Sequence, residues 1–360
     1  MEEILPYLNE QVYLIFLISV MIVSGIMKKH NLLVDVFNFI IIHVKSNRMV
    51  VAIISMIGGI LPIPGRVTVS AGILSMIAPC CSQDDCNDGK KVCRKSRSKF
   101  GIIDYLSTHH YYLWSPLEKT VVLPMAVLGI SWGAFLGLVW PLIAITFIYI
   151  IWYIFWKFQE SDIILDRSEF DGYNFNRIMI GAAPFFAGLG LLIFGLHGAL
   201  VFGILALYYI ILTKSSNIME IIKYVNWWLV LVLALVLVLS VYFKQHSGEI
   251  LASLEAYSAV IDINTMAGFL TISGFAFISS WLMGSSGKFA GIVALLVTLY
   301  GADYLVWFLV LEFMAYNLSP MHKCLSIGSM YFGTPIRKYF EAIIVWQGLL
   351  VVYAVTTLIW

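Results

Sequence analysis

The chain contains the stretch Tyr112-Leu-Trp-Ser115-Pro116-Leu-Glu118-Lys119 and, 204 residues later, the related stretch Tyr316-Asn-Leu-Ser319-Pro320-Met-His322-Lys323. Continued to Gly129 and Gly333, the two stretches share five identical residues in eighteen positions. Ordinary residue frequencies would give about one identity over that length. The chain therefore holds an internal repeat, and both copies place a helix break and a lysine inside an apolar run.

The composition indicates a membrane protein. Of the 360 residues, 61% are hydrophobic and 12% are charged, with a mean hydropathy of +0.90. Soluble domains are about half apolar, whereas several runs here approach or exceed the roughly 20 apolar residues that cross a bilayer. We expect an all-α polytopic membrane protein.

The repeat divides the chain into repeat 1 (1–156), a linker with two extra spans (157–224) and repeat 2 (225–360). Each repeat is predicted to contain a span, an interfacial helix, a re-entrant hairpin, a broken helix and a second span. The predicted elements are 11–27, 32–46, 49–79, 103–130 and 132–156 in repeat 1, with a cytoplasmic loop at 80–99; 178–194 and 197–213 in the linker; and 225–243, 250–265, 266–300, 303–334 and 339–360 in repeat 2. Five crossings then separate the repeats, so they are predicted to be inverted.

The basic residues predict an orientation in the cytoplasmic (inner) membrane. With the N-terminus outside, seventeen lysines and arginines fall on the inner side and only Lys244 falls outside, as the positive-inside rule requires. Four basic residues remain at membrane depth, namely Arg66, Lys119, Lys288 and Lys323. Charge at that depth is costly and marks functional sites.

The Ser-Pro pairs predict half-helices that begin near the middle of the membrane. Pro116 and Pro320 cannot continue a preceding helix, and each suits the first position of a new one, with Ser115 or Ser319 as its N-cap. Glu118 lies where a capping box places its acid. Simple kinks and snorkelling lysines are the alternative interpretation.

Helix N-termini attract anions, because their N–H groups are unsatisfied and carry partial positive charge. Discontinuous helices at a repeat interface are also the usual substrate site of secondary transporters. We therefore predict a site for a small anionic solute at the two breaks and the two hairpin tips. Its predicted residues are Gly65, Arg66, Ser115, Pro116, Lys119, Ser285, Ser286, Gly287, Lys288, Ser319, Pro320 and Lys323.

Other titratable side chains have less specific interpretations. Glu118, His322 and Glu312 are candidates for coupling to sodium or protons, with capping as the alternative for Glu118, whereas His109 and His110 are interpreted as structural. One loop contains Cys80, Cys81, Cys86 and Cys93. These cysteines lack a C-x₂-C pair and are only a weak indication of a metal site.

The sequence also argues against several functions. Phosphate loops, nucleophile elbows and dinucleotide fingerprints are missing from it, so neither an enzyme nor a bound cofactor other than a coupling ion is predicted. Nothing in it indicates a nucleic-acid partner.

Three segments carry a resemblance to a known family. They are Ile63-Pro64-Gly65-Arg66-Val67-Thr68-Val69-Ser70-Ala71, Trp114-Ser115-Pro116-Leu117, and Leu318-Ser319-Pro320-Met321-His322-Lys323-Cys324 with Tyr331-Phe332-Gly333. They resemble motifs of an uncharacterised prokaryotic membrane family labelled domain of unknown function 401. That family is similar to the gluconate permeases and the wider ion transporter superfamily. The resemblance implies inverted repeats with two re-entrant hairpins, elevator motion and a homodimer.

The leading expectation is a secondary active transporter of a small anion, in particular an organic carboxylate, coupled to sodium or protons by elevator-type alternating access across the lipid bilayer. A channel-like anion pore is one alternative. A non-transporting membrane sensor or interaction protein that uses the basic cysteine-rich loop is another.

Overall fold

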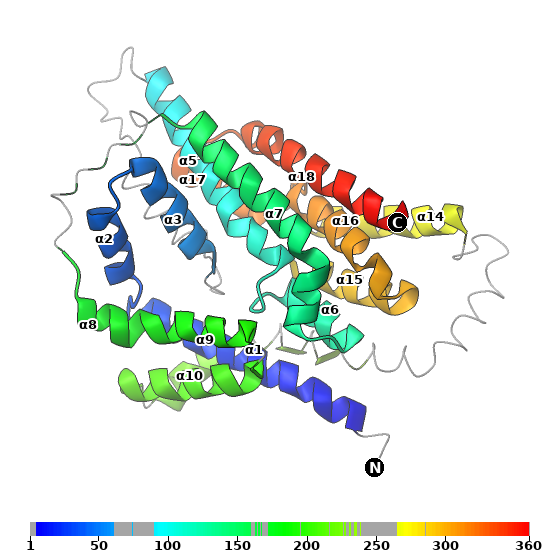
Figure 1. The fold of residues 1–360 in the computed structure, drawn as a ribbon, viewed down its shortest axis with the longest axis horizontal. Helices are drawn as coiled ribbons and strands as arrows, with labels where there is room; N and C mark the ends of the chain where they lie inside the picture. The colour runs from blue at the N-terminus through cyan, green and yellow to red at the C-terminus, as the bar shows by residue number, and fades with distance from the viewer. Residues whose placement is uncertain are drawn as a thin grey trace.

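The computed structural model describes residues 5–60, 90–159, 172–194, 196–215, 217–225, 265–284 and 286–359, with a few isolated positions between these ranges. Every regular element in these ranges is a helix (Figure 1). The interfacial helix predicted at 250–265, the first hairpin tip and most of the span predicted at 225–243 lie outside the described residues.

Four helical segments are long and apolar enough to cross a membrane: Trp132–Lys157, Phe175–Leu192, Met266–Met283 and Ile336–Ile359. A fifth candidate is the pair Leu14–Lys29 and Val34–His43, which passes the same test together but bends by 65°. The outer faces of these helices carry exposed apolar side chains, among them Trp156, Phe275 and Val352. Such a surface suits contact with lipid, and the chain has the character of a multi-pass membrane protein.

The N-terminal helix packs against the helices of the linker. Helix α1 (Leu5–Lys29) lies beside α10 (Gly198–Leu212), where the rings of Phe16 and Phe202 meet edge to face with centroids 5.5 Å apart. The segment made of α8 (Phe175–Arg177), a π-helical turn (Ile178–Ala182) and α9 (Ala183–Ile193) lies next to α10 in Figure 1. These helices form one end of the molecule.

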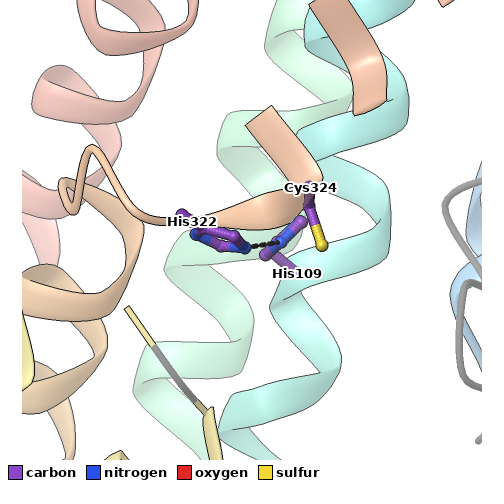
Figure 2. A group of neighbouring side chains, drawn as sticks. All are labelled: His109, His322 and Cys324. Atoms are coloured by element: carbon purple, nitrogen blue, oxygen red, sulfur yellow. Dashed lines mark hydrogen bonds between the residues drawn. The ribbon is translucent and has the colours of Figure 1, made fainter. Parts of the chain in front are cut away.

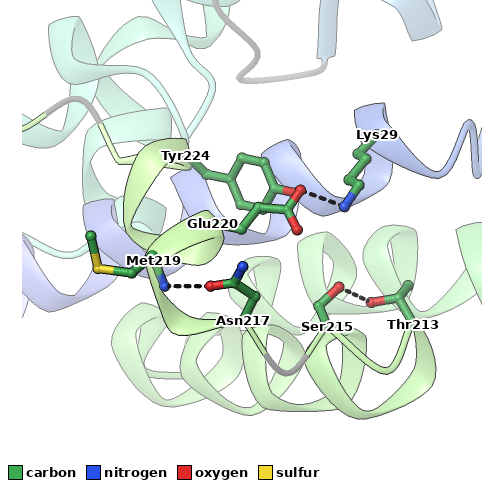
Figure 3. A network of polar contacts seen from close by, with 7 residues as sticks. All are labelled: Lys29, Thr213, Ser215, Asn217, Met219, Glu220 and Tyr224. Atoms are coloured by element: carbon green, nitrogen blue, oxygen red, sulfur yellow. Dashed lines mark hydrogen bonds and ion pairs between the residues drawn. The ribbon is translucent and has the colours of Figure 1, made fainter.

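A short helix, α11 (Ile218–Tyr224), closes this end (Figure 3). Its Glu220 accepts hydrogen bonds from Lys29 at the end of α1 and from the Tyr224 hydroxyl. The hydrogen bond from the Lys29 ammonium lowers the pKa of Glu220, so the pair is charged at neutral pH. Because both side chains are partly exposed, solvent screens the attraction between their charges. The contact between α1 and α11 therefore depends more on the packing of the Tyr224 side chain over Gly25.

The rest of the described chain is built around α5 (Lys90–His109), which contacts α3 (Asn47–Ile60), α7 (Trp132–Lys157) and α18 (Ile336–Ile359). The prediction of a loop at 80–99 is wrong for residues 90–99, which are the start of α5. Lysine and arginine are good helix formers, and this segment holds neither proline nor glycine, so its polarity does not prevent a helix. The helix predicted at 32–46 is α2 (Val34–His43).

Both breaks are present, and their half-helices correspond in detail. Helix α6 (Lys119–Leu128) and helix α17 (Lys323–Phe332) each have ten residues and begin at the repeated lysine. Each ends at a glycine in the left-handed region, Gly129 (φ 65°) or Gly333 (φ 62°). The local repeat in the sequence is therefore a repeat in structure.

The predicted starts of these half-helices at Pro116 and Pro320 are wrong, and so is the predicted capping box. The Glu118 N–H donates to the Ser115 carbonyl (3.0 Å), and the His322 N–H donates to the Ser319 carbonyl (3.2 Å), which makes each Ser-Pro pair the start of a β-turn. Proline at the second position of such a turn is as favourable as at a helix start. Neither serine caps the helix; each hydroxyl accepts from the N–H two residues on, at 3.3 Å and 3.2 Å.

The second hairpin consists of α14 (Met266–Met283) and α15 (Ser286–Tyr300), and the turn at Gly284 lies where the sequence predicts it. After it come a short 3₁₀ turn (Ala302–Tyr304) and α16 (Leu305–Asn317). Ten of the thirteen residues of α16 and eight of the ten of α6 are buried. These two helices, unlike the lipid-facing spans, form the interior.

Candidate functional site

The two copies of the repeat meet in the interior through equivalent residues. Tyr112 follows α5, Tyr316 lies near the end of α16, and their hydroxyl oxygens are 3.3 Å apart. Their rings meet edge to face with centroids 5.3 Å apart, and both side chains are buried. Residues that are 204 positions apart in the sequence are thus neighbours at the point where both helices break.

Next to this contact lie two histidines whose imidazole rings each direct one nitrogen toward the other ring (Figure 2). His109 is the last residue of α5, His322 immediately precedes α17, and their Nε2 atoms are 3.0 Å apart. Both side chains are only 1% exposed. Cys324, in the first turn of α17, brings its sulfur to the same place.

Each histidine is held by a tyrosine of its own part of the chain. His109 donates from Nδ1 to the Tyr105 carbonyl (2.6 Å) and stacks on the Tyr105 ring at 3.9 Å between centroids. His322 donates from Nδ1 to the Tyr316 carbonyl (3.1 Å) and packs on the Tyr316 ring at 4.0 Å. A carbonyl can only accept, so the proton of each ring is on Nδ1. Both Nε2 atoms therefore direct lone pairs toward the shared space.

The Tyr105 hydroxyl connects this pair to α16. It donates to Oδ1 of Asn317 (2.9 Å) and lies 3.1 Å from Nδ1 of His322. Asn317 is completely buried at the end of α16. One hydroxyl thus holds α5, the end of α16 and the start of α17 together.

Removing that hydroxyl with Tyr105→Phe is expected to lower stability by about 1–3 kcal/mol, because the buried polar groups lose a partner that water cannot replace. The measurement is the midpoint of thermal unfolding in detergent. Tyr208→Phe is the control, since its hydroxyl makes one bond near the surface, to the Ile180 carbonyl. A Tyr105→Phe protein no less stable than the Tyr208→Phe protein would contradict this account of the hydroxyl.

The turn of the second hairpin packs directly on the second break. Gly284 has a φ of +54°, and a Cβ added there would lie 2.8 Å from the Ser319 hydroxyl oxygen. The Trp281 indole N–H donates to the Leu318 carbonyl (3.0 Å). Behind this contact the Ser280 hydroxyl donates to the completely buried Glu312 of α16. The structure thus brings a predicted hairpin tip, Ser319 and the region of Glu312 together.

In repeat 1, α3 leads toward the tip of the hairpin predicted at 49–79 and packs on α5. The Tyr111 hydroxyl donates to the Met56 carbonyl, and Gly59 lies against Ser107 and Tyr111. Gly65 and Arg66 of the predicted tip are outside the described residues.

The remaining predicted site residues occupy different environments. Ser115, Pro116, Ser319, Glu118 and His322 are buried, Lys119 and Ser286 are half-buried, and Pro320 and Lys323 are exposed. Gly287 and Lys288 fall within α15, but the side chain of Lys288 is outside the described part, as is Ser285. Cys80, Cys81 and Cys86 are also outside it, and Cys93 falls in α5 without a described side chain.

Sequence patterns did not indicate Tyr105, Asn317 and Cys324 as parts of this centre, and they favoured a structural interpretation of His109. A possible signal was the position of Cys324, which directly follows the repeated lysine at the helix break. No local pattern predicted that His109 would reach His322 across 213 positions.

A family model described as "Protein of unknown function (DUF401)" matches residues 6–359 of the chain. The match covers both breaks, both predicted hairpin segments and every candidate span. No curated protein matches the chain.

Proposed function

Given that the chain belongs to the DUF401 family, we propose that it is a secondary active transporter of a small anion, in particular an organic carboxylate. The observation that carries the proposal is the buried contact between Tyr112 and Tyr316, where the two equivalent breaks meet. Breaks at a repeat interface are where secondary transporters bind their substrates. We also propose that the chain is similar to the gluconate permeases and to the wider ion transporter superfamily.

The preference for an anion rests on the two half-helices. Both α6 and α17 have ten residues and begin at a lysine, so each places the positive end of its helix dipole and a lysine charge at its first turn. Lys119 is half-buried at the start of α6. The second hairpin tip, which packs on Ser319, would close the same region.

The transport cycle follows from the same arrangement. We propose that the two halves are inverted repeats in the cytoplasmic membrane with the N-terminus outside, and that hairpins and half-helices move together in an elevator motion within a homodimer. Helix α17 lies antiparallel to α5. His322, just before the start of α17, contacts His109 at the end of α5, and the Tyr331 carbonyl near the end of α17 accepts a hydrogen bond from Arg97 near the start of α5 (2.9 Å). This reversal supports the inverted arrangement. Glu118, His322 and Glu312 are the groups for coupling to protons or sodium, because all three are buried.

The test is anion binding by the purified protein. A panel of carboxylates and inorganic anions, with and without sodium, is screened for a rise in the unfolding midpoint, and the best anion is then used for binding and for uptake into proteoliposomes. We expect Lys119→Ala and Lys323→Ala to weaken its binding at least tenfold, because a charge-assisted contact contributes about 1.5–3 kcal/mol.

The control is Lys338→Ala, which removes an exposed lysine that pairs with Glu341 on α18, away from both breaks. Unchanged binding and uptake in both lysine variants would reject the site. A steady single-channel conductance at fixed potential would instead favour a channel-like pore, and loss of uptake on deletion of 82–89 alone would favour a role for the cysteine-rich loop.

A further inference from the structure

His109, His322 and Cys324 are arranged as metal ligands. One ring nitrogen of each histidine and Sγ of the cysteine all lie within 4.8 Å of one another, and the described residues contain no second group of three such side chains. The two histidines are buried and the cysteine is half-buried. They come from α5 and from the start of α17, so an ion bound here would join two different parts of the chain (Figure 2).

The protonation of the two rings requires a cation between them. Because both Nδ1 atoms donate to backbone carbonyls, both Nε2 atoms carry lone pairs, and these face each other at 3.0 Å. Two lone pairs at that distance repel each other unless a proton or a metal ion lies between them. A histidine whose other nitrogen donates to a carbonyl is also the usual state of a metal ligand.

The sulfur of Cys324, as a third donor, distinguishes a metal ion from a shared proton. A proton shared by two nitrogens does not need a sulfur, whereas zinc takes three or four nitrogen and sulfur ligands. Cys324 lies in the first turn of α17, where the positive end of the helix favours negative charge on its sulfur. Two imidazoles and one thiolate select a zinc-like cation over magnesium or calcium, which prefer oxygen.

The distance between the two nitrogens fits such an ion. At zinc bond lengths of about 2.0–2.1 Å to nitrogen and 2.3 Å to sulfur, ligand atoms of a tetrahedral site are about 3.3–3.6 Å apart. The two nitrogens are within a few tenths of an ångström of that separation. Rotation about one side-chain bond moves the Cys324 sulfur, whereas each histidine is fixed by its carbonyl and by the ring of Tyr105 or Tyr316.

We propose that His109, His322 and Cys324 bind one zinc-like transition-metal ion that ties α5 to the start of α17. The site has three protein ligands, so a fourth position is open to water or to another donor. This inference goes beyond the proposed transport function and stands without it; with the ion bound to His322, the coupling role would fall to Glu118 and Glu312. The bound ion would hold the second break against the first broken helix and so stabilise the protein.

The test uses the full chain in detergent, stripped of metal, with Cys80, Cys81, Cys86 and Cys93 all changed to serine so that the other cysteines cannot contribute. Titration with Co²⁺ is expected to give one ion per chain and a thiolate-to-cobalt absorption band. Zn²⁺ is expected to displace the Co²⁺ and to raise the unfolding midpoint. Cys324→Ser should abolish the band, and His322→Gln should weaken Zn²⁺ binding at least tenfold, the lower bound seen even for outer-shell changes.

Cys324→Ser changes one atom of a half-buried side chain, so it remains informative if His322→Gln fails to fold. A metal-free unfolding midpoint equal to that of the four-serine protein shows that the Cys324→Ser variant is folded. The proposal is overturned if the four-serine protein gives no thiolate band, or if Zn²⁺ raises the unfolding midpoint of Cys324→Ser as much as it raises that of the four-serine protein. The first of these outcomes would leave a shared proton as the cation between the histidines.

Discussion

Gly59→Ala is expected to lower the stability of the protein by about 2 kcal/mol, and Gly59→Leu by more, since adding atoms to a packed interior costs about 1–3 kcal/mol and sometimes more. A Cβ at Gly59 would lie 2.4 Å from the Tyr111 ring and 2.5 Å from the Ser107 carbonyl oxygen. The ring can shift, but the carbonyl belongs to the backbone of α5. The substitution must therefore move α3 away from the first broken helix.

The measurement is the unfolding midpoint in detergent, with Gly274→Ala as the matched control. Gly274 is also a helical glycine, in α14, and a Cβ there has no atom within 4 Å. It should be neutral or gain up to about 1 kcal/mol, because alanine is the better helix former. A Gly59→Ala protein as stable as the Gly274→Ala protein would show that α3 does not approach α5 this closely.

Gly284→Ala is expected to lower stability by about 2–4 kcal/mol for two reasons that add. The residue has a φ of +54°, and a left-handed conformation costs a residue with a Cβ about 1–2 kcal/mol. The added Cβ would also lie 2.8 Å from the Ser319 hydroxyl oxygen and 2.9 Å from the Met321 backbone carbon. The turn between α14 and α15 would then be pushed off the second break.

Gly333→Ala separates these two reasons. Gly333 has nearly the same conformation, with a φ of +62°, but a Cβ there meets no atom within 4 Å. Its substitution should cost only the backbone component, about 1–2 kcal/mol. If Gly284→Ala lowers the unfolding midpoint no further than Gly333→Ala does, the hairpin turn is not packed on the break as described.

Much of the helical architecture could be predicted from local sequence signals. The apolar run at 132–156 is α7, and the two interrupted runs at 266–283 and 288–300 are α14 and α15. Gly129 and Gly333 end their half-helices because glycine, which has no Cβ, adopts the left-handed conformation at the least steric cost. The start of each half-helix was less predictable, because Ser-Pro suits both a helix N-terminus and a β-turn.

The candidate site was predicted only in part. The repeat identified the two breaks, and the structure brings Ser319 to the second hairpin turn and Tyr112 to Tyr316. The chemical environment of the lysines was not predictable, since Lys119 is half-buried while its equivalent Lys323 is exposed. Side-chain burial depends on which neighbouring helices cover each half-helix, and the repeat does not determine that.

The amino-acid sequence by itself determined the properties that depend on neighbouring residues: an apolar helical chain, two broken helices at equivalent positions, and the glycines at which turns and helix ends occur. Only the tertiary structure decided that His109, His322 and Cys324 converge, and that Tyr105 orients one histidine while contacting the other. The physical reason is that a hydrophobic run specifies a helix through contacts within a few residues. A centre built from ligands 213 positions apart depends instead on how whole helices pack.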